Sequence, residues 1–310
     1  MWPTPGGHLM DPLIVLFGLG VGLLVGTTGV GGGSLMTPLL ILVFGIKPTV
    51  AIGTDLAYAA VTKTVGGWRH FRNGTVNMGI SLWLAVGSVP GALGGVYVLR
   101  LLEDAYGAEA FDSLLLELVA AALLVTGLAV IGRILFSPAS AERERDSLEL
   151  TRRYKAAAVT LGLTVGFVLG LTSAGSGSLI AVGLILIFRL TQRRIVGTDV
   201  FHAAILLWVA AIAHLISGNV DLSLAGNILI GSIPGVWIGS GLAVRLPEGA
   251  LRPTLAVVLL AAGLALLNKA GVGFPIALIF IAPLVAAAGL MLLHVLRSRS
   301  GRVHPAPEPT

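Results

Sequence analysis

The sequence is organised around one glycine-rich stretch, Thr27-Thr-Gly-Val-Gly-Gly-Gly-Ser34, and a second one that begins 144 residues later, Leu171-Thr-Ser-Ala-Gly-Ser-Gly-Ser178. Apolar sequence flanks both stretches. Glycine has no Cβ atom and weakens a helix, so each stretch predicts a loop with exposed backbone N–H groups. Such a loop can hold an anion, and its role depends on whether it lies at a membrane surface or inside the bilayer.

The composition is that of a membrane protein. Of the 310 residues, 55% are hydrophobic and 11% are charged, and the mean hydropathy is +0.95. These values predict an all-α polytopic membrane protein. The absence of cysteine excludes disulfides, thiolate catalysis and cysteine-bound metal centres. The basic residues lie in short connections between apolar segments, so the net charge of +5 indicates membrane topology and not nucleic-acid binding.

Two of the nine apolar segments are too long for a single span. They cover residues 13–46 and 156–188. The first would form a helix about 51 Å long, whereas the hydrocarbon core of a bilayer is about 30 Å thick. Each contains one glycine-rich stretch near its middle. The sequence therefore predicts a broken helix or a hairpin, with the glycines at its tip.

An internal repeat relates the two halves of the chain. Residues 22–96 align without a gap onto residues 166–240, and 25 of the 75 pairs are identical. The shared motifs include Gly53-Thr-Asp55 with Gly197-Thr-Asp199, and Gly87-Ser-Val-Pro-Gly91 with Gly231-Ser-Ile-Pro-Gly235. Chance identity would not keep one register over such a length.

The basic residues indicate how the repeats lie in the membrane. If each long segment enters and leaves on the same side, one face receives sixteen Lys and Arg residues and the other receives only Lys47, Arg100 and Lys269. That asymmetry predicts an outside N-terminus and a cytoplasmic C-terminus. Each half then has a hairpin plus three spans, so the two repeats have inverted topology, as in many secondary transporters. The predicted parts are an extracytoplasmic tail (1–12), the first repeat (13–136), a cytoplasmic linker (137–154), the second repeat (155–268), an extra C-terminal span (269–297) and a cytoplasmic tail (298–310).

The twice-repeated pattern of apolar arm, glycine-rich tip, Gly-Thr-Asp and Gly-Ser-x-Pro-Gly resembles the TauE/SafE family of sulfite and organosulfonate exporters. The resemblance covers nearly the whole chain outside the tails and the linker. It implies a multi-pass protein of the cytoplasmic membrane that moves small sulfur-containing anions such as sulfite, thiosulfate or sulfoacetate. The second tip departs from the first, because Ser173 and Ser176 replace Gly29 and Gly32.

The two tips are the predicted substrate site. Backbone N–H groups at broken helix ends carry partial positive charge, and serine and threonine add hydroxyl donors, a combination that suits an oxyanion. The alternative is that the glycines only allow helices to cross closely. The candidate substrate-binding residues are Thr28, Gly31, Gly32, Gly33, Ser34, Thr172, Ser173, Gly175, Ser176, Gly177, Ser178 and Lys63.

Charged residues inside the apolar segments are further candidates. Asp55 and Asp199 each follow Gly-Thr early in a predicted helix. One interpretation is that they bind a transported proton. The alternative is that they only stabilise the start of the helix, which the preceding threonine caps. His202 lies three residues after Asp199 and is a further candidate for proton transfer. Lys63 lies well inside its span, where it attracts the anion or pairs with Asp55.

The remaining motifs give weaker signals. Interfacial packing is the favoured role for His70 and His214, and no histidine pair has the spacing of a metal-binding helix. The Gly-Ser-x-Pro-Gly motifs are either hinges or helix-packing sites. We expect no cofactor, no bound metal and no nucleic-acid partner; the expected partners are the bilayer and the anion.

The leading interpretation is a secondary transporter, an exporter in which the two halves rock around a midplane site, with proton coupling as one option. The sequence has no phosphate-binding loop for ATP. A passive anion channel is an alternative, and an intramembrane enzyme is a weaker one because no nucleophile or metalloprotease motif is present. The sequence leaves the particular anion, the direction, the coupling ion and the oligomeric state open.

Overall fold

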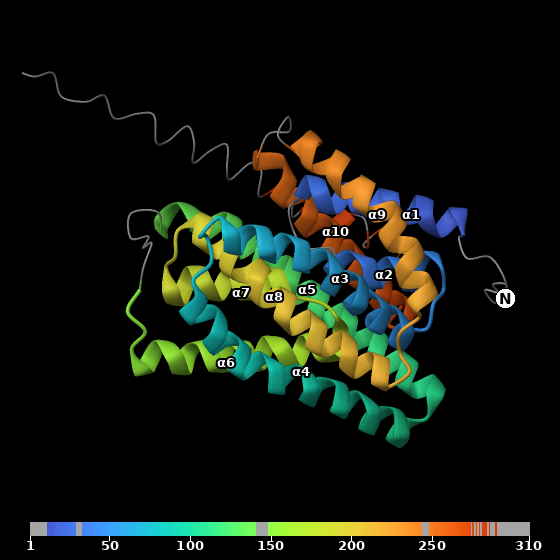
Figure 1. Ribbon diagram of the computed structural model, residues 1–310. Helices are drawn as coiled ribbons and strands as arrows, with labels where there is room; N and C mark the ends of the chain where they lie inside the picture. The colour runs from blue at the N-terminus through green and yellow to red at the C-terminus, as the bar shows by residue number, and fades with distance from the viewer. Residues whose placement is uncertain are drawn as a thin grey trace, which may run out of the picture.

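The computed structural model describes residues 11–28, 33–140, 148–243 and 248–273, with isolated positions between 275 and 289. These residues form helices and contain no strand, which confirms the predicted all-α fold (Figure 1). The helices are α1 (Pro12–Thr28), α2 (Gly33–Val43), α3 (Pro48–Arg72), α4 (Met78–Tyr106), α5 (Ala108–Ser140), α6 (Arg152–Thr172), α7 (Ser176–Gly183), the π-helical turn η2 (Leu184–Phe188), α8 (Gln192–Ile216), α9 (Leu222–Ala243) and α10 (Glu248–Lys269).

The helix boundaries repeat with the same offset of 144 residues as the sequence. Helix α3 begins at Pro48 and α8 begins at Gln192. Helices α4 and α9 begin at Met78 and Leu222. The sequence repeat is therefore a repeat of helices, in which α1–α5 correspond to α6–α10.

Both long apolar segments are divided into two helices, as the glycine-rich stretches predict. In the second half, α6 ends at Thr172, and the two positive φ angles that follow are 59° at Ser173 and 93° at Gly175. The left-handed region is unfavourable for any residue with a Cβ atom, so Ser173 must be held there by its surroundings. In the first half, α1 ends at Thr28 and α2 begins at Gly33.

In each half, the two arms fold back on each other. The ring centroid of Phe17, near the start of α1, lies 4.7 Å from that of Phe44, just after the end of α2. In the second half, the ring of Tyr154 in the first turn of α6 lies 5.8 Å from Phe188, the residue equivalent to Phe44. The outer ends of the two arms therefore lie together, as in a hairpin.

Two pairs of non-equivalent helices from opposite halves, α4 with α6 and α1 with α9, pack in parallel. Figure 1 shows α4 and α6 along one side of the molecule, α1 and α9 along the opposite side, and α3 and α8 between them. A Cβ atom at Gly87 of α4 would collide with the carbonyl oxygen of Val159, and a Cβ atom at the equivalent Gly231 of α9 would collide with that of Val15. These glycines of the Gly-Ser-x-Pro-Gly motifs therefore permit close backbone contact, which is the packing role proposed from the sequence.

The equivalent helices α3 and α8 run antiparallel where they pack. The backbone N–H of Asp221, which follows α8, donates to Thr54 Oγ1 near the start of α3 at 3.0 Å. The equivalent bond joins the N–H of Asn77, which follows α3, to Thr198 Oγ1 near the start of α8 at 2.9 Å. The threonine of each Gly-Thr-Asp motif therefore holds the loop that follows the equivalent helix in the other half.

Helices α5 and α10 are the second equivalent pair that runs antiparallel. Ser113 Oγ, near the start of α5, donates to the carbonyl oxygen of Ala270, just after the end of α10, at 3.1 Å. Farther along, Gly127 of α5 lies against Leu260 of α10, and Gly263 of α10 lies against Leu124 of α5. The same geometry therefore relates both equivalent pairs.

Five helices of the described part are long and apolar enough to cross a membrane. They are Met78–Tyr106, Glu109–Gly132, Arg152–Thr172, Gln192–Ile216 and Leu222–Leu242. Shorter apolar helices cover Pro12–Thr27, Gly177–Phe188 and Pro253–Lys269. Helix α3 carries Asp55 and Lys63 and is not in either set. Together with the repeat, these helices make the chain a multi-pass membrane protein. The predicted end of the C-terminal span, most of both tails and the middle of the linker lie outside the described residues.

Candidate functional site

The Asp55 carboxyl group lies at the centre of the described polar contacts. Asp55 is fully buried in α3. Its Oδ2 atom accepts a hydrogen bond from Thr37 Oγ1 of α2 at 2.6 Å and another from Ser173 Oγ of the second tip at 2.8 Å. Within the described part of the chain, its Oδ1 atom has no hydrogen-bond partner. One carboxyl group therefore joins two helices of the first half to the glycine-rich tip of the second.

The second tip is buried inside the protein. Ser173 is 1% exposed and Thr172 is 3% exposed. Thr172 Oγ1 donates to the carbonyl oxygen of Val168 at 2.7 Å and accepts the backbone N–H of Ala174 at 3.2 Å. On the other side of the tip, a Cβ atom at Gly175 would lie 3.3 Å from Thr126 Oγ1 of α5. Irregular backbone is tolerated at membrane depth only where it packs on protein or lines a cavity, and this tip packs on α3 and α5.

Asp199 lies beside the helix that starts at the second tip. Its side chain on α8 is 8% exposed. Its Oδ2 atom lies 3.5 Å from the position that a Cβ atom of Gly177 would take in the first turn of α7. Ser178, the next residue of that turn, is also buried. A negative charge is favourable at the N-terminal end of a helix, where backbone N–H groups are not bonded within the helix.

Neither aspartate caps the helix on which it lies. Helix α3 begins at Pro48 with Lys47 as its N-cap, and α8 begins at Gln192 with Thr191 as its N-cap. Asp55 and Asp199 each lie about two turns farther on. Thr54 and Thr198 bond to loops of the opposite half instead of capping. The helix-start alternative for these acids is therefore wrong, because the Gly-Thr-Asp motifs lie inside their helices.

His202 connects α8 to the proline-containing helix α4. Its side chain is fully buried. The Nε2 atom lies 2.8 Å from Ser88 Oγ in the first Gly-Ser-x-Pro-Gly motif. In the described part of the chain, its Nδ1 atom has no hydrogen-bond partner. The contact places a titratable ring, three residues after Asp199, against the motif that contains Pro90.

Lys63 does not pair with Asp55 in the structure. The two residues are eight positions apart on α3, which corresponds to about 12 Å along a helix. Lys63 is half-buried, and the nearby Val65 and Trp68 are 71% and 62% exposed. Among the described residues, no hydrogen bond or ion pair joins it to Asp55. A role of Lys63 in attracting the anion stays a prediction.

The equivalent histidines differ in their surroundings. His214 is fully buried, and its Nε2 atom lies 2.9 Å from the carbonyl oxygen of Gly170 in the last turn of α6. His70 is partly exposed, and its Nδ1 atom lies 2.9 Å from Thr75 Oγ1. His214 therefore supports the helix that leads into the second tip, a role that sequence reasoning missed.

Several predicted substrate-binding residues cannot be compared with the structure. Gly31 and Gly32 lie outside the described residues, as do the side chains of Thr28, Ser34 and Ser176. The backbone of Gly33 begins α2. Substrate binding by the first tip therefore stays a prediction, and the geometry of the candidate site is described from the second tip.

Sequence reasoning missed Thr37, Ser88 and Thr126, which border the site from α2, α4 and α5. Ser88 had a signal, because it is the serine of a motif present in both halves. Thr37 and Thr126 are isolated hydroxyls in apolar helices, and nothing in the sequence places them beside a tip. Among the described residues, no group of three His, Asp or Glu side chains could hold a metal ion.

Comparison with known proteins agrees with this picture. Residues 14–266 match the protein family described as "Sulfite exporter TauE/SafE". The probable membrane transporter protein YjnA of Bacillus subtilis is 40% identical over 258 residues, which cover 83% of this chain and 100% of that protein. The probable membrane transporter protein YdhB of the same organism is 28% identical over 255 residues, or 82% of this chain and 99% of that protein. No solved structure matches the chain.

Proposed function

The chain belongs to the sulfite exporter TauE/SafE family, and we propose that it is a secondary transporter that exports a small sulfur-containing oxyanion. Sulfite, thiosulfate and sulfoacetate are the candidate substrates. The more general conclusion, that the chain is a membrane transporter of this family, rests on the family match and on relatives that are named membrane transporter proteins. These relatives favour transport over the enzymatic alternative.

One observation carries the proposal: the bond between Asp55 and Ser173. It joins α3 of the first half to the buried helix break of the second half at 2.8 Å. A break of this kind exposes backbone N–H groups that no membrane lipid can satisfy. Placing the break against the opposite half gives a polar site at the contact between the two repeats, which is where secondary transporters of this architecture bind their substrates.

The chemistry of the second tip suits an oxyanion. The first turn of α7 supplies backbone N–H groups, and its N-terminal end carries partial positive charge. The buried Ser178 lies in this turn, and the Ser173 hydroxyl, which donates to Asp55 in this structure, becomes a donor to the anion when that bond breaks. A small anion with three or four oxygen atoms accepts several such bonds at once. We assign substrate binding to this tip together with the equivalent first tip.

Inverted topology is part of the proposal. The hairpin geometry of the arms and the antiparallel packing of two equivalent pairs, α3 with α8 and α5 with α10, support it. A two-fold axis along the membrane normal would make equivalent helices parallel, whereas an axis in the membrane plane makes them antiparallel. Together with the charge distribution, this geometry supports an outside N-terminus, a cytoplasmic linker and a cytoplasmic C-terminus.

Alternating access then requires the contacts between halves to break and re-form. Two buried side-chain bonds of this kind are Asp55 with Ser173 and Ser88 with His202. Both are side-chain bonds between helices of opposite halves, and α4, which carries Ser88, contains Pro90. Proline removes one backbone hydrogen bond from the helix and so lowers the cost of bending there.

The positions of the acids support proton coupling as part of the proposal. The Asp199 carboxylate faces the same turn of α7 that we assign to the anion. Two negative charges repel each other strongly at that separation in a medium of low dielectric constant. The anion therefore binds most favourably when Asp199 is protonated, so proton and anion bind together. Asp55 and His202 are the further candidates to carry the proton.

Fluxes in proteoliposomes test the function. We expect saturable transport of at least one of sulfite, thiosulfate and sulfoacetate, with sulfate and phosphonates as comparison anions, and accumulation against a gradient when a pH difference is imposed. If no sulfur oxyanion moves, the substrate class is wrong. Much faster flux without accumulation would instead identify a passive channel.

Two variants test the coupling. Asp55→Asn and Asp199→Asn keep nearly the same shape but do not titrate. We expect at least one to retain downhill flux while losing its dependence on the pH gradient. Unchanged coupling in both variants would reject the assignment of the proton to these acids without affecting the substrate class.

A further inference from the structure

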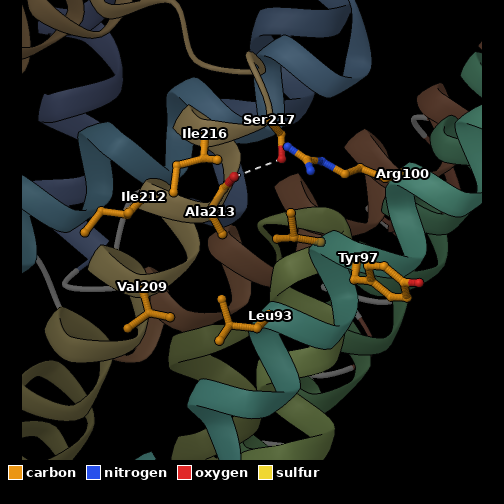
Figure 2. Close-up of a pocket in the computed structure, with 9 residues that line it drawn as sticks. Leu93, Tyr97, Arg100, Val209, Ile212, Ala213, Ile216 and Ser217 are labelled. Atoms are coloured by element: carbon orange, nitrogen blue, oxygen red, sulfur yellow. Dashed lines mark hydrogen bonds between the residues drawn. The ribbon is translucent and has the colours of Figure 1, made fainter.

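A groove lies between α4 and α8. It has a volume of about 370 Å³, which is within the range of roughly 300–1,000 Å³ that is typical of small-molecule sites. Figure 2 shows its lining side chains, which come from both helices. They are Leu93, Val96, Tyr97 and Arg100 of α4, Val209, Ile212, Ala213 and Ile216 of the C-terminal part of α8, and Ser217, which follows α8. The lining is therefore apolar except at one end.

The rim of the groove belongs to the outer surface of the helices. Leu93 and Ile212, on opposite sides of the groove, are 47% and 49% exposed, and Ile216 is 76% exposed. The same face of α4 continues through the exposed Leu82 and Val86. Such stripes on membrane-crossing helices face hydrocarbon, because exposure to water would be unfavourable. The groove therefore opens toward lipid chains and not toward an aqueous path.

The polar end of the groove carries one cation. Arg100 is exposed, and in Figure 2 its guanidinium group points toward Ser217. The Ser217 hydroxyl donates to the carbonyl oxygen of Ala213 at 2.9 Å. Among the described residues, Arg100 makes no hydrogen bond or ion pair, although Glu103 and Asp104 follow one turn later on α4. Its five N–H donors are therefore available to a ligand.

The position along the helices matches a lipid headgroup. Arg100 lies six residues before the end of α4, and Ser217 is the residue that caps the end of α8. Both therefore lie near the level at which these helices leave the hydrocarbon core. The Tyr97 side chain, 62% exposed, lies one turn deeper. Tyrosine and arginine at this depth are typical of the membrane interface.

We propose that the groove is a binding site for a phospholipid, whose phosphodiester group pairs with Arg100 and one of whose acyl chains lies along the groove. The guanidinium group binds phosphate oxygens through two parallel hydrogen bonds and is weakly hydrated, so it suits this partner. Basic groups at the ends of apolar grooves between membrane helices recognise lipid headgroups in the same way. The proposal concerns binding alone and does not depend on the transported anion.

Native mass spectrometry of the full chain tests it. The protein is released from detergent after titration with phosphatidylglycerol, and retained lipid is counted for the wild type, Arg100→Gln and Ile212→Trp. We expect one lipid to be retained by the wild type, and a decrease in affinity of about tenfold or more in Arg100→Gln, the loss expected for one charge-assisted pair. Ile212→Trp fills the apolar part of the groove, keeps the arginine and should also lose the lipid.

The matched control is Lys47→Gln, which removes an exposed cation at the N-cap of α3 that does not line the groove. It should retain lipid like the wild type. Equal loss in Lys47→Gln and Arg100→Gln would overturn the site, since only net charge would then matter. Displacement of the lipid by inorganic phosphate alone, a lipid-free wild type, or a lipid-free dimer joined through this face would each overturn it as well.

Discussion

Ser173 provides the sharpest test of the contact between the two halves, because its hydroxyl and its backbone act in opposite directions. The hydroxyl donates to the Asp55 carboxyl group at 2.8 Å in a buried setting, and removing a donor from a buried acceptor costs about 1–3 kcal/mol. The backbone has a φ of 59°, which costs a residue with a Cβ atom about 1–2 kcal/mol. Ser173→Ala loses the bond and keeps the strain, so it should destabilise the fold by about 2 kcal/mol.

Ser173→Gly loses the same bond but removes the backbone strain. The greater conformational freedom of glycine in the unfolded chain costs about 0.5–1 kcal/mol and offsets part of this gain in stability. It should therefore be more stable than Ser173→Ala by about 0.5–1 kcal/mol. The free energy of unfolding is measured by titration with a denaturing detergent in mixed micelles, followed by tryptophan fluorescence. Ser240→Ala is the control, because this exposed hydroxyl bonds only to its own helix. A glycine variant less stable than the alanine variant would refute the strain argument, and two variants as stable as the control would refute the bond.

Two further predictions use equivalent positions, so each variant has a matched partner in the other half. Thr54→Val and Thr198→Val each remove the acceptor of one loop N–H, and both should destabilise the fold by about 1–2 kcal/mol in the same assay; a cost at only one position would show that the two bonds are not equivalent. Gly87→Ala and Gly231→Ala each force a Cβ atom against a carbonyl oxygen of the neighbouring helix, and both should cost about 1–3 kcal/mol or more. An alanine tolerated at either glycine would contradict the close parallel packing of these helix pairs.

The helices and their breaks could be predicted because local chemistry determines them. Glycine runs interrupt apolar segments that are too long to be single spans, and 25 identities at one offset reveal the repeat. The predicted break in the second long segment is observed, since α6 ends at Thr172 inside the glycine-rich stretch. The equivalence of Gly53-Thr-Asp55 and Gly197-Thr-Asp199 could also be predicted from the sequence. The bond of each threonine to a loop of the other half could not.

The partners of these elements could not be predicted, because apolar helices in a membrane do not have a polar face that indicates their orientation. Helix α1 packs against α9 of the other half and not only against the second arm of its own hairpin. Its glycines contact α9 residues that are more than 200 positions away in the sequence. The Thr37 to Asp55 bond likewise depends on how the hairpin folds back. Sequence reasoning looked for a partner of Asp55 among charged residues and proposed Lys63, whereas the structure provides two hydroxyl groups.

The two halves share one scaffold but differ in their polar side chains, and this difference bears on direction. Backbone contacts are equivalent, as the Thr54 and Thr198 bonds show. The residues that face the acids are not equivalent in sequence, since Thr37 corresponds to Ala181, Ser173 to Gly29 and Tyr58 to His202. In an exactly symmetric inverted repeat, the outward-open and inward-open states have equal free energies, because the symmetry axis exchanges them. Different side chains at equivalent positions of the two halves make these free energies unequal. We therefore expect a preference for one side of the membrane to arise from the side chains around Asp55 and Asp199.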